Sequence, residues 1–199
     1  LASRLKLKIT TLPKEFFDTP EILIAGCGTG QHSISTARRF RDCNVLAIDL
    51  SLRSLAYAKR KTLELGIENI DYMQGDILDL GSLKRSFSII ESGGVLHHME
   101  DPFRAWQILT KRLLKGGPMK IGLYSQLARK DIEEFRNEIA KGGFPETNQD
   151  IKAIRGKIIN NSSLLHKAAL NWNDFFTTSE VRDLLFHVQE HTFNLLQIK

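Results

Sequence analysis

The sequence predicts an α/β protein with a doubly wound, mostly parallel sheet, followed by a helical C-terminal region. Short apolar runs alternate with helix-like patterns from residue 21 to about residue 125, the order expected when crossover helices join parallel strands. A glycine or a carboxylate follows each of the first four runs. Because ligands bind beyond the carboxyl ends of the strands in such sheets, these residues are predicted to share one site.

The strands and helices of this sheet are predicted from apolar runs, helical spacing and turn residues. Glu21–Ala25 is a buried strand, a glycine loop follows it, and residues 30–42 have the periodicity of a helix. The next strand is Asn44–Ile48, and its helix begins at the N-cap Ser51 and stops at Gly66. Further strands are predicted over 70–73, 87–90 and 119–124, and Asp101-Pro102 begins the helix before the last of them.

Three segments are predicted along the chain: an N-terminal lead-in over 1–20, a core over 21–125, and a helical substrate or cap region over 126–199. In the last segment, apolar spacing predicts helices over 126–141, 148–159 and 179–188, the third of them capped by Thr178. The sequence shows no convincing pair of further strands before Lys199.

The composition is that of an ordinary globular protein, with 42% hydrophobic and 26% charged residues. No apolar run approaches the roughly 20 residues needed to span a bilayer, and no signal peptide is evident, so a cytoplasmic protein without a membrane partner is expected. The net charge of +5 is spread over short clusters, which argues against nucleic-acid binding. Cys27 and Cys43 are too few for a disulfide framework or a zinc site, so no metal is expected.

Three glycines at alternate positions, Gly26, Gly28 and Gly30, join the first strand to the first helix. Glycines there permit a tight turn and let a ligand approach the backbone, while the helix N-terminus favours negative charge. A dinucleotide-binding loop would need glycine or alanine at position 31, where this chain has Gln31. The loop therefore predicts a nucleotide-like ligand other than a nicotinamide or flavin dinucleotide.

Carboxylates follow the predicted strands. Asp49 comes 21 residues after Gly28, where it can accept both ribose hydroxyls of an adenosine ligand or interact with the dipole of the following helix. Asp76 could accept the exocyclic amine of adenine, with Ile77 against the ring, or could simply form a turn. Glu91 follows the fourth run and is expected to face the ligand crevice, because an unpartnered buried carboxylate is costly.

Together these segments resemble the motifs of class I S-adenosylmethionine (SAM) dependent methyltransferases over roughly residues 20–125. Ile22–Gly30, Ala47–Ser51 and Gln74–Ile77 are similar to the family's glycine loop, ribose-binding strand end and adenine-binding turn, and Ser92–Pro102 is similar to the segment after its fourth strand. The resemblance implies a Rossmann-like fold, SAM as cofactor and methyl transfer to an acceptor. The implied cofactor contacts come from Gly26, Cys27, Gly28, Gly30, Asp49, Leu50, Asp76, Ile77 and Glu91.

Outside the core, Gly122–Ser125 and Leu184–His191 resemble a bacterial subgroup often fused to tetratricopeptide repeats, so such repeats are expected as partners. Two departures from the family pattern accompany this resemblance. The family usually has an acidic residue where this chain has Ile24, so a contact to the methionine amino group is lost or supplied elsewhere, with Glu91 as a candidate. The family sheet also ends in a hairpin that this sequence lacks, which predicts a chain incomplete after Lys199 or a sheet edge completed in another way. An exposed edge of that kind would be prone to association, and the oligomeric state stays open.

Methyl transfer is an in-line displacement, in which positioning and exclusion of water supply much of the acceleration. A general base is needed only when the acceptor must lose a proton, and His97 and His98 are the candidates, with structural hydrogen bonding as the alternative. Tyr124, His187 and Glu190 are candidates for the acceptor site, with packing or helix capping as the alternative. Three functions stay open: a methyltransferase for an unidentified acceptor, a SAM-binding or regulatory domain without turnover, and an RNA or protein methyltransferase.

Overall fold

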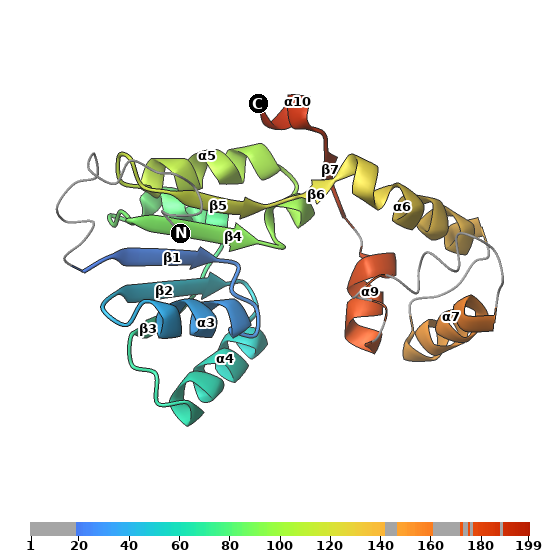
Figure 1. Cartoon of the computed structure of the whole chain (residues 1–199), viewed down its shortest axis with the longest axis horizontal. Helices are drawn as coiled ribbons and strands as arrows, with labels where there is room; N and C mark the ends of the chain where they lie inside the picture. Colours follow the sequence, from blue (N-terminus) through green and yellow to red (C-terminus); the bar gives the residue numbers. More distant parts are fainter. Residues whose placement is uncertain (1–18, 142–146, 161–171, 173–174, 176, 188) are drawn as a thin grey trace. The chain divides into compact units, whose positions relative to one another are not determined.

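The structure is a computed structural model that describes residues 19–141, 147–160, 172, 175, 177–187 and 189–199. Almost all of the predicted lead-in over residues 1–20 lies outside these residues. The chain divides into two compact units, the first ending at Leu123 and the second beginning at Tyr124. Figure 1 colours the described part of the first unit from blue to green and the second from yellow to red.

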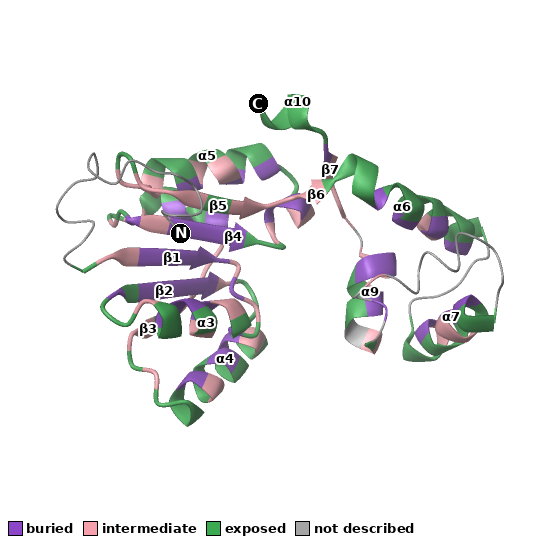
Figure 2. Cartoon of the chain, viewed as in Figure 1, coloured by how far each residue is buried: buried purple, intermediate pink, exposed green. Residues whose placement is uncertain are grey.

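Five parallel strands form the sheet of the first unit, in the order β3-β2-β1-β4-β5 (Figure 1). They are β1 (Glu21–Ala25), β2 (Asn44–Asp49), β3 (Ile70–Gln74), β4 (Ile89–Gly93) and β5 (Met119–Gly122). The chain winds outward in one direction from β1 to β3 and in the other from β4 to β5, so the topological switch point lies between β1 and β4. The predicted doubly wound parallel sheet is confirmed, and its central strands are the most deeply buried (Figure 2).

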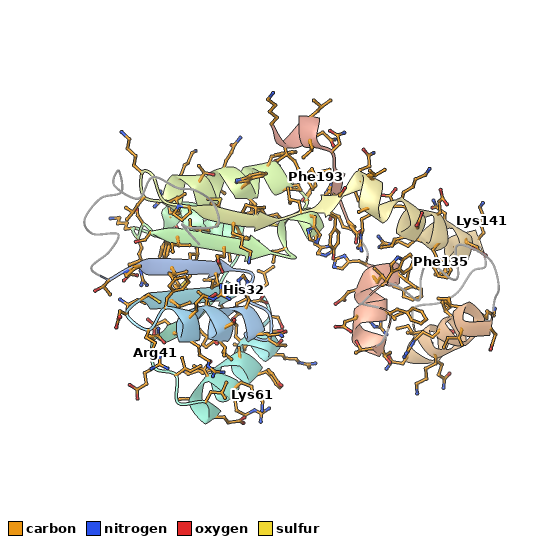
Figure 3. The ribbon with its side chains drawn as sticks, viewed as in Figure 1. His32, Arg41, Lys61, Phe135, Lys141 and Phe193 are labelled. Atoms are coloured by element: carbon orange, nitrogen blue, oxygen red, sulfur yellow. The ribbon has the colours of Figure 1, made fainter. Side chains whose placement is uncertain are left out.

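In the described part of the first unit, three α-helices begin where the sequence predicts them, and two 3-10 helices are additional. They are α3 (Gln31–Arg39), α4 (Leu52–Glu64), α5 (Pro102–Arg112) and two 3-10 helices, η2 (Ile77–Ser82) and η3 (Leu96–His98). Ser51 caps α4 by accepting the N–H of Ser54 at 3.2 Å, and Asp101 caps α5 by accepting the N–H of Arg104 at 2.9 Å. Both predicted N-caps are confirmed, whereas α3 ends at Arg39, earlier than predicted. Figure 3 shows the side chains on these helices.

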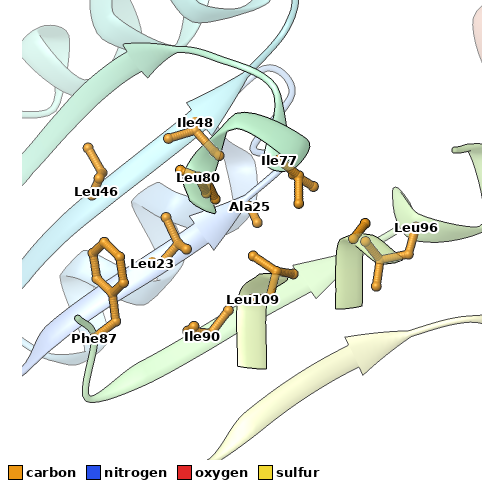
Figure 4. Close-up of a cluster of buried hydrophobic side chains, with 11 residues drawn as sticks. Leu23, Ala25, Leu46, Ile48, Ile77, Leu80, Phe87, Ile90, Leu96 and Leu109 are labelled. Atoms are coloured by element: carbon orange, nitrogen blue, oxygen red, sulfur yellow. The ribbon is translucent and has the colours of Figure 1, made fainter. Parts of the chain in front are cut away.

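Alternate residues of the central strands pack against opposite layers of helices, as the pleat of a strand requires. On β1, Leu23 and Ala25 belong to the apolar cluster in Figure 4, to which α5 and η2 contribute. Ile22 and Ile24 belong to a second cluster, to which α3 and α4 contribute. Because both faces of the sheet are covered, its strands are nearly continuous apolar runs, and this is why the sequence reveals them.

The fourth strand differs from the prediction. The prediction of a strand over 87–90 that ends before Glu91 is wrong. Strand β4 continues to Gly93 and pairs Glu91 in register with Ile24 of β1. The carboxylate tolerates this position because His32 and Thr36 of α3 provide polar partners for it. The fifth strand also ends earlier than predicted, since it stops at Gly122.

The second unit is helical, as predicted. Its elements are α6 (Gln126–Lys141), α7 (Asn148–Asn160), α9 (Thr178–Phe186), the short α10 (Leu195–Ile198) and two very short strands, β6 (Tyr124–Ser125) and β7 (Thr192–Phe193). Helices α6, α7 and α9 pack around an apolar cluster of their own that includes Phe135 and Ile151. The cap of α9 is Thr177 rather than the predicted Thr178, since Oγ1 of Thr177 accepts the N–H of Glu180 at 3.1 Å.

Strands β6 and β7 pair with each other in parallel, with Tyr124 opposite Thr192. The sequence analysis did not predict them, because strands this short have no detectable periodicity. Among the described residues they form a sheet separate from the five-stranded one. No helix in the described part of the chain is both long and apolar enough to cross a membrane.

Candidate functional site

The glycine loop turns the chain from the end of β1 into α3. Gly26, Gly28 and Gly30 all have positive φ angles, of 79°, 52° and 86°, a backbone region that residues with a Cβ rarely occupy. The N–H groups of Gly26 and Cys27 donate to the carbonyl of Ile48 at 2.9 and 2.8 Å. The loop is therefore anchored to the end of β2, which is the strand that carries Asp49.

Gly28 and Gly30, in the loop before α3, differ in what surrounds them. A methyl group on Gly30 would lie 2.6 Å from Cβ of Ala58 on α4, so glycine lets the two helices approach each other there. A methyl group on Gly28 would meet no atom within 4 Å. Gly28 is thus free of side-chain packing, which leaves its backbone open to a ligand.

Asp49, at the end of β2, is held by two backbone donors. Its Oδ2 accepts the N–H of Gly28 at 2.7 Å, and its Oδ1 accepts the N–H of Ser51 at 2.9 Å. A carboxylate has about four lone-pair positions, so each oxygen can accept a further hydrogen bond. The carboxylate is therefore fixed in place while keeping acceptor capacity for a ligand.

Two adjoining cavities open at this edge of the sheet. The larger has a volume of about 580 Å³ and the smaller about 190 Å³, and Gly26, Asp49 and Val95 line both. The larger is otherwise lined by Cys27, Gly28, Thr29, Gln31, His32, Ser35, Gly93 and Gly94. The smaller is otherwise lined by Leu50, Gly75, Asp76, Ile77 and Met99. The structure thus brings the predicted loop, strand-end and turn residues together.

The smaller cavity is mainly apolar, with one carboxylate. Asp76 caps η2, where its Oδ1 accepts the N–H of Leu78 at 2.9 Å, and its backbone neighbour Gly75 donates to the carbonyl of Asp49 at 3.2 Å. Ile77 is buried behind it. This combination of apolar walls and a carboxylate can enclose a flat ring that carries an amine donor.

Cys27 is the loop's only side chain with a titratable group. Burial, together with the nearby Asp49 carboxylate, raises the pKa of the thiol to about 12. The thiol is therefore neutral at physiological pH and fills space as a small apolar group.

Glu91 and His32 form a polar pair that the sequence analysis only half predicted. His32 lines the larger cavity, and its Nε2 lies 2.5 Å from Oε2 of the buried Glu91 carboxylate. Thr36 donates to the same oxygen at 3.3 Å. The hydrogen bond from His32 holds the pKa of Glu91 below its ordinary value despite its burial, so this carboxylate is ionised.

Glu91 does not itself line either cavity; His32 stands between the carboxylate and the larger one. Sequence analysis missed His32 because a single polar residue at the start of a helix has no distinguishing pattern. Its position two residues after the loop glycine Gly30 is the only indication in the sequence.

Comparison with known proteins shows what the first unit resembles. Residues 22–117 match the family model described as a methyltransferase domain. This segment is therefore similar to a methyltransferase domain. The matched residues include every strand end that lines the two cavities, and they exclude the second unit.

Two relatives align with about three fifths of the chain. An uncharacterised protein of Synechococcus sp. is 35% identical over 122 residues, which cover 61% of this chain and 29% of the relative. Trans-aconitate 2-methyltransferase of Deinococcus radiodurans is 30% identical over 131 residues, which cover 62% of this chain and 47% of the relative. The chain spans less than half the length of both.

A solved structure extends the likeness in fold beyond the methyltransferase domain. PKMT2 from Rickettsia typhi aligns with 91% of this chain and 37% of its own, with a TM-score of 0.74 and 20% identity. The same protein has been solved in complex with AdoHcy, with a TM-score of 0.70. At this identity the likeness concerns the fold alone.

The predicted base candidates lie beside the site but not in its walls. His97 and His98 lie in η3, between the lining residues Val95 and Met99. The His97 side chain is 1% exposed, and its ring centroid lies 4.2 Å from that of His98. Neither imidazole is among the residues that line the two cavities of the methyltransferase domain.

The predicted acceptor residues Tyr124, His187 and Glu190 all belong to the second unit. The Arg129 guanidinium stacks on the Tyr124 ring at 3.7 Å and binds the Glu190 carboxylate through two hydrogen bonds of 3.1 and 2.7 Å. Arg136 donates to the carbonyl of His187 at 2.6 Å and lies 3.4 Å from Glu190. The structure therefore gives these residues partners within their own unit, and their role toward an acceptor stays a prediction.

Proposed function

We propose that the protein transfers the methyl group of SAM to an acceptor by in-line displacement, with the donor bound across the two cavities of the methyltransferase domain. The observation that supports this best is that the Asp49 carboxylate lines both cavities, where they adjoin. The donor has a matching order of groups: an aromatic base at one end, ribose hydroxyls in the middle and a charged amino-acid tail at the other end.

The smaller cavity suits the adenine ring. Leu50, Ile77 and Met99 supply apolar surface for the two faces of a flat base. The Asp76 oxygen that does not cap η2 is available to accept the exocyclic amine. Adenine would thus be recognised both by shape and by one hydrogen bond.

The middle of the site suits the ribose. Each Asp49 oxygen already accepts one backbone N–H and can accept one hydroxyl as well. Because the carboxylate is held from two sides, little ordering is needed when the ribose binds. The amino-acid tail then lies in the larger cavity, along the backbone of Gly28.

The chain's own contribution to the reaction is positioning. SAM, when bound, supplies an activated methyl group whose leaving group is a neutral thioether. The loop and Asp49 hold the donor, and Gly93 and Gly94 add no side chains to the larger cavity, which leaves room for an acceptor. Precise placement of the two reactants is worth several orders of magnitude in rate.

A SAM-binding domain without turnover is a second candidate. It is favoured by the position of His97 and His98, since neither lines the two cavities described above. An acceptor that needs no deprotonation would make this objection irrelevant. The acceptor itself, contact with tetratricopeptide repeats and oligomerisation stay predictions from the sequence.

Isothermal titration calorimetry with S-adenosylhomocysteine tests the cofactor part of the proposal. Wild type is compared with Asp49→Ala and with Asp71→Ala, which removes an exposed carboxylate from the neighbouring strand β3. Hydrogen bonds to a charged group contribute about 1.5–3 kcal/mol, so Asp49→Ala should weaken binding roughly tenfold to a hundredfold. Asp71→Ala should bind like wild type.

Equal binding by wild type and Asp49→Ala would overturn the ribose contact. No binding by wild type would overturn the proposed function as a whole. Where binding is found, incubation with radiolabelled SAM and a cell extract separates the two candidates, because label transferred beyond that in the extract alone requires this protein to be an active enzyme.

A further inference from the structure

We propose that the His32–Glu91 pair binds the ammonium group of the donor's methionine end, and so replaces, from a neighbouring strand, the acidic residue missing at Ile24. This inference rests on the proposed function. It assigns to the larger cavity a specificity-determining residue, His32, and a positioning residue, Glu91.

The register of the sheet places Glu91 beside Ile24. Ile24 of β1 and Glu91 of β4 are partners in adjacent parallel strands, so their side chains lie on the same face of the sheet. Ile24 packs in the cluster to which α3 contributes, and Glu91 contacts His32 and Thr36 of that helix. A carboxylate at Glu91 therefore lies one strand away from position 24, on the same side.

His32 lies in the wall of the larger cavity and contacts Glu91. Glu91 is 7% exposed and lines neither cavity, whereas His32 lines the larger one together with the glycine loop. The carboxylate can therefore contact a ligand in these cavities only through the imidazole. Figure 3 labels His32 on α3.

The two ring nitrogens of His32 have different roles in this contact. Oε2 of Glu91 has no proton to donate when ionised, so the Nε2 that lies 2.5 Å away is the donor in this contact. In the neutral ring Nδ1 then keeps a lone pair and accepts hydrogen bonds. The pair as a whole carries the single negative charge of the carboxylate.

The other walls of the larger cavity favour the same ligand group. Of the residues that line it, Asp49 is the one with a permanent charge, and no lysine or arginine is among them in the described structure. Lys120 acts on Glu91 only from a distance, through its charge. A cavity with negative wall groups attracts the ammonium of a methionine tail more than its carboxylate.

The test compares two ligands that differ in the tail alone. S-adenosylhomocysteine has the amino-acid end, and 5′-methylthioadenosine has the same adenosine and sulfur without it. Calorimetric titrations at pH 8 use wild type, His32→Ala, His32→Gln, Glu91→Gln and the control Arg38→Ala, an exposed position of α3.

His32→Ala is expected to weaken S-adenosylhomocysteine binding roughly tenfold or more, the range for a hydrogen bond to a charged group, and to change methylthioadenosine binding by less than about twofold. In His32→Gln the amide can donate a hydrogen bond to Glu91 and accept one from the ammonium, so this variant should recover part of the lost affinity. Glu91→Gln should give an intermediate loss for the same ligand, and Arg38→Ala none. The ratio of the two affinities in one protein sample does not depend on the folded fraction.

If His32→Ala loses the same affinity for both ligands, the proposal is overturned, because His32 would then shape the cavity without contacting the tail. The desamino analogue of S-adenosylhomocysteine separates the ammonium from the carboxylate, and binding to wild type as tight as that of S-adenosylhomocysteine would also overturn it. If wild type binds neither ligand, the proposed function fails together with this inference. If wild type binds both ligands equally, the inference alone fails.

Discussion

A methyl group placed on Gly26 would come within 2.2 Å of Cγ2 of Val95, a distance far inside van der Waals contact. Both residues line both cavities, and Gly26 has a φ of 79°. Glycine is thus required at position 26 for two reasons, the left-handed backbone and the side chain of Val95. The loop and the segment after β4 fix each other's positions.

Gly26→Ala is expected to reduce the free energy of unfolding by about 3 kcal/mol, from overpacking against Val95 and from the strained backbone. Urea denaturation followed by circular dichroism measures this. Gly28→Ala is the matched control, because its φ is also positive but no atom lies within 4 Å of the added methyl group. Gly28→Ala should reduce the free energy of unfolding by about 1–2 kcal/mol, because backbone strain is its only cost. Equal losses in the two variants would contradict the contact between Gly26 and Val95.

The Cys27 thiol is expected to be unreactive in the folded protein. Burial and the Asp49 carboxylate raise its pKa from 9.0 to about 12, which lowers the thiolate fraction at pH 8 roughly a thousandfold. In a Cys43→Ser variant, Cys27 is the one remaining cysteine, so Ellman's reagent reports on it alone. Labelling should be slow in the native protein and fast in guanidinium chloride. Fast labelling of the native protein at pH 8 would show that the loop opens readily.

The sequence predicts the sheet and half of the site for one physical reason. A parallel sheet with both faces covered needs apolar strands such as Glu21–Ala25, and the residues after such strands gather at one edge. Asp49 and Asp76 could therefore be placed near the glycine loop without a structure.

Contacts that depend on the register or on the second unit could not be predicted in this way. Glu91 meets His32 only because β4 runs on to Gly93, and an acidic residue within an apolar run looks like the end of a strand. The pairing of Arg129 with Glu190 joins residues that are 61 positions apart. Charge pairs at that separation leave no periodic pattern in a sequence.

Glu91 is expected to stabilise the fold in a pH-dependent way. The hydrogen bond from His32 lowers its pKa in the folded state below the ordinary value of 4.5. A lowered pKa stabilises the folded protein above the unfolded-state value, and this contribution is lost as the pH falls through the folded-state value. Glu91→Gln should therefore be less stable than wild type at pH 7, and the difference should shrink below about pH 4.5.

Urea denaturation of both proteins between neutral and acidic pH measures this difference, with Glu100→Gln as the control for an exposed carboxylate. A stability difference between wild type and Glu91→Gln that stays constant across this range would contradict the hydrogen bond between His32 and the ionised Glu91.

Glu190→Gln is expected to destabilise the second unit. The carboxylate is buried between Arg129 and Arg136, with side-chain exposures of 3%, 8% and 20%, respectively. Removing one partner of a buried ion pair typically costs about 3–5 kcal/mol, because the other charges stay buried without compensation.

Trp172 packs edge-on against Phe135 at 6.1 Å between centroids, so its fluorescence reports on this unit in a Trp106→Phe background. Glu134→Gln, on the exposed side of α6, is the control. If Glu190→Gln melts like the control yet loses turnover on an identified acceptor, Glu190 acts on the acceptor rather than in the fold.

The register partnership between Ile24 and Glu91 has a consequence for the evolution of such domains. In a parallel sheet, adjacent strands offer equivalent positions on one face, so a charged group can migrate sideways by a single strand spacing of about 5 Å while the backbone stays the same. Two ordinary point substitutions, an apolar residue gained on one strand and an acid on the next, are sufficient for that exchange. A motif defined along one continuous segment finds no acid at Ile24, whereas a motif defined across the sheet finds one at Glu91, on the adjacent strand.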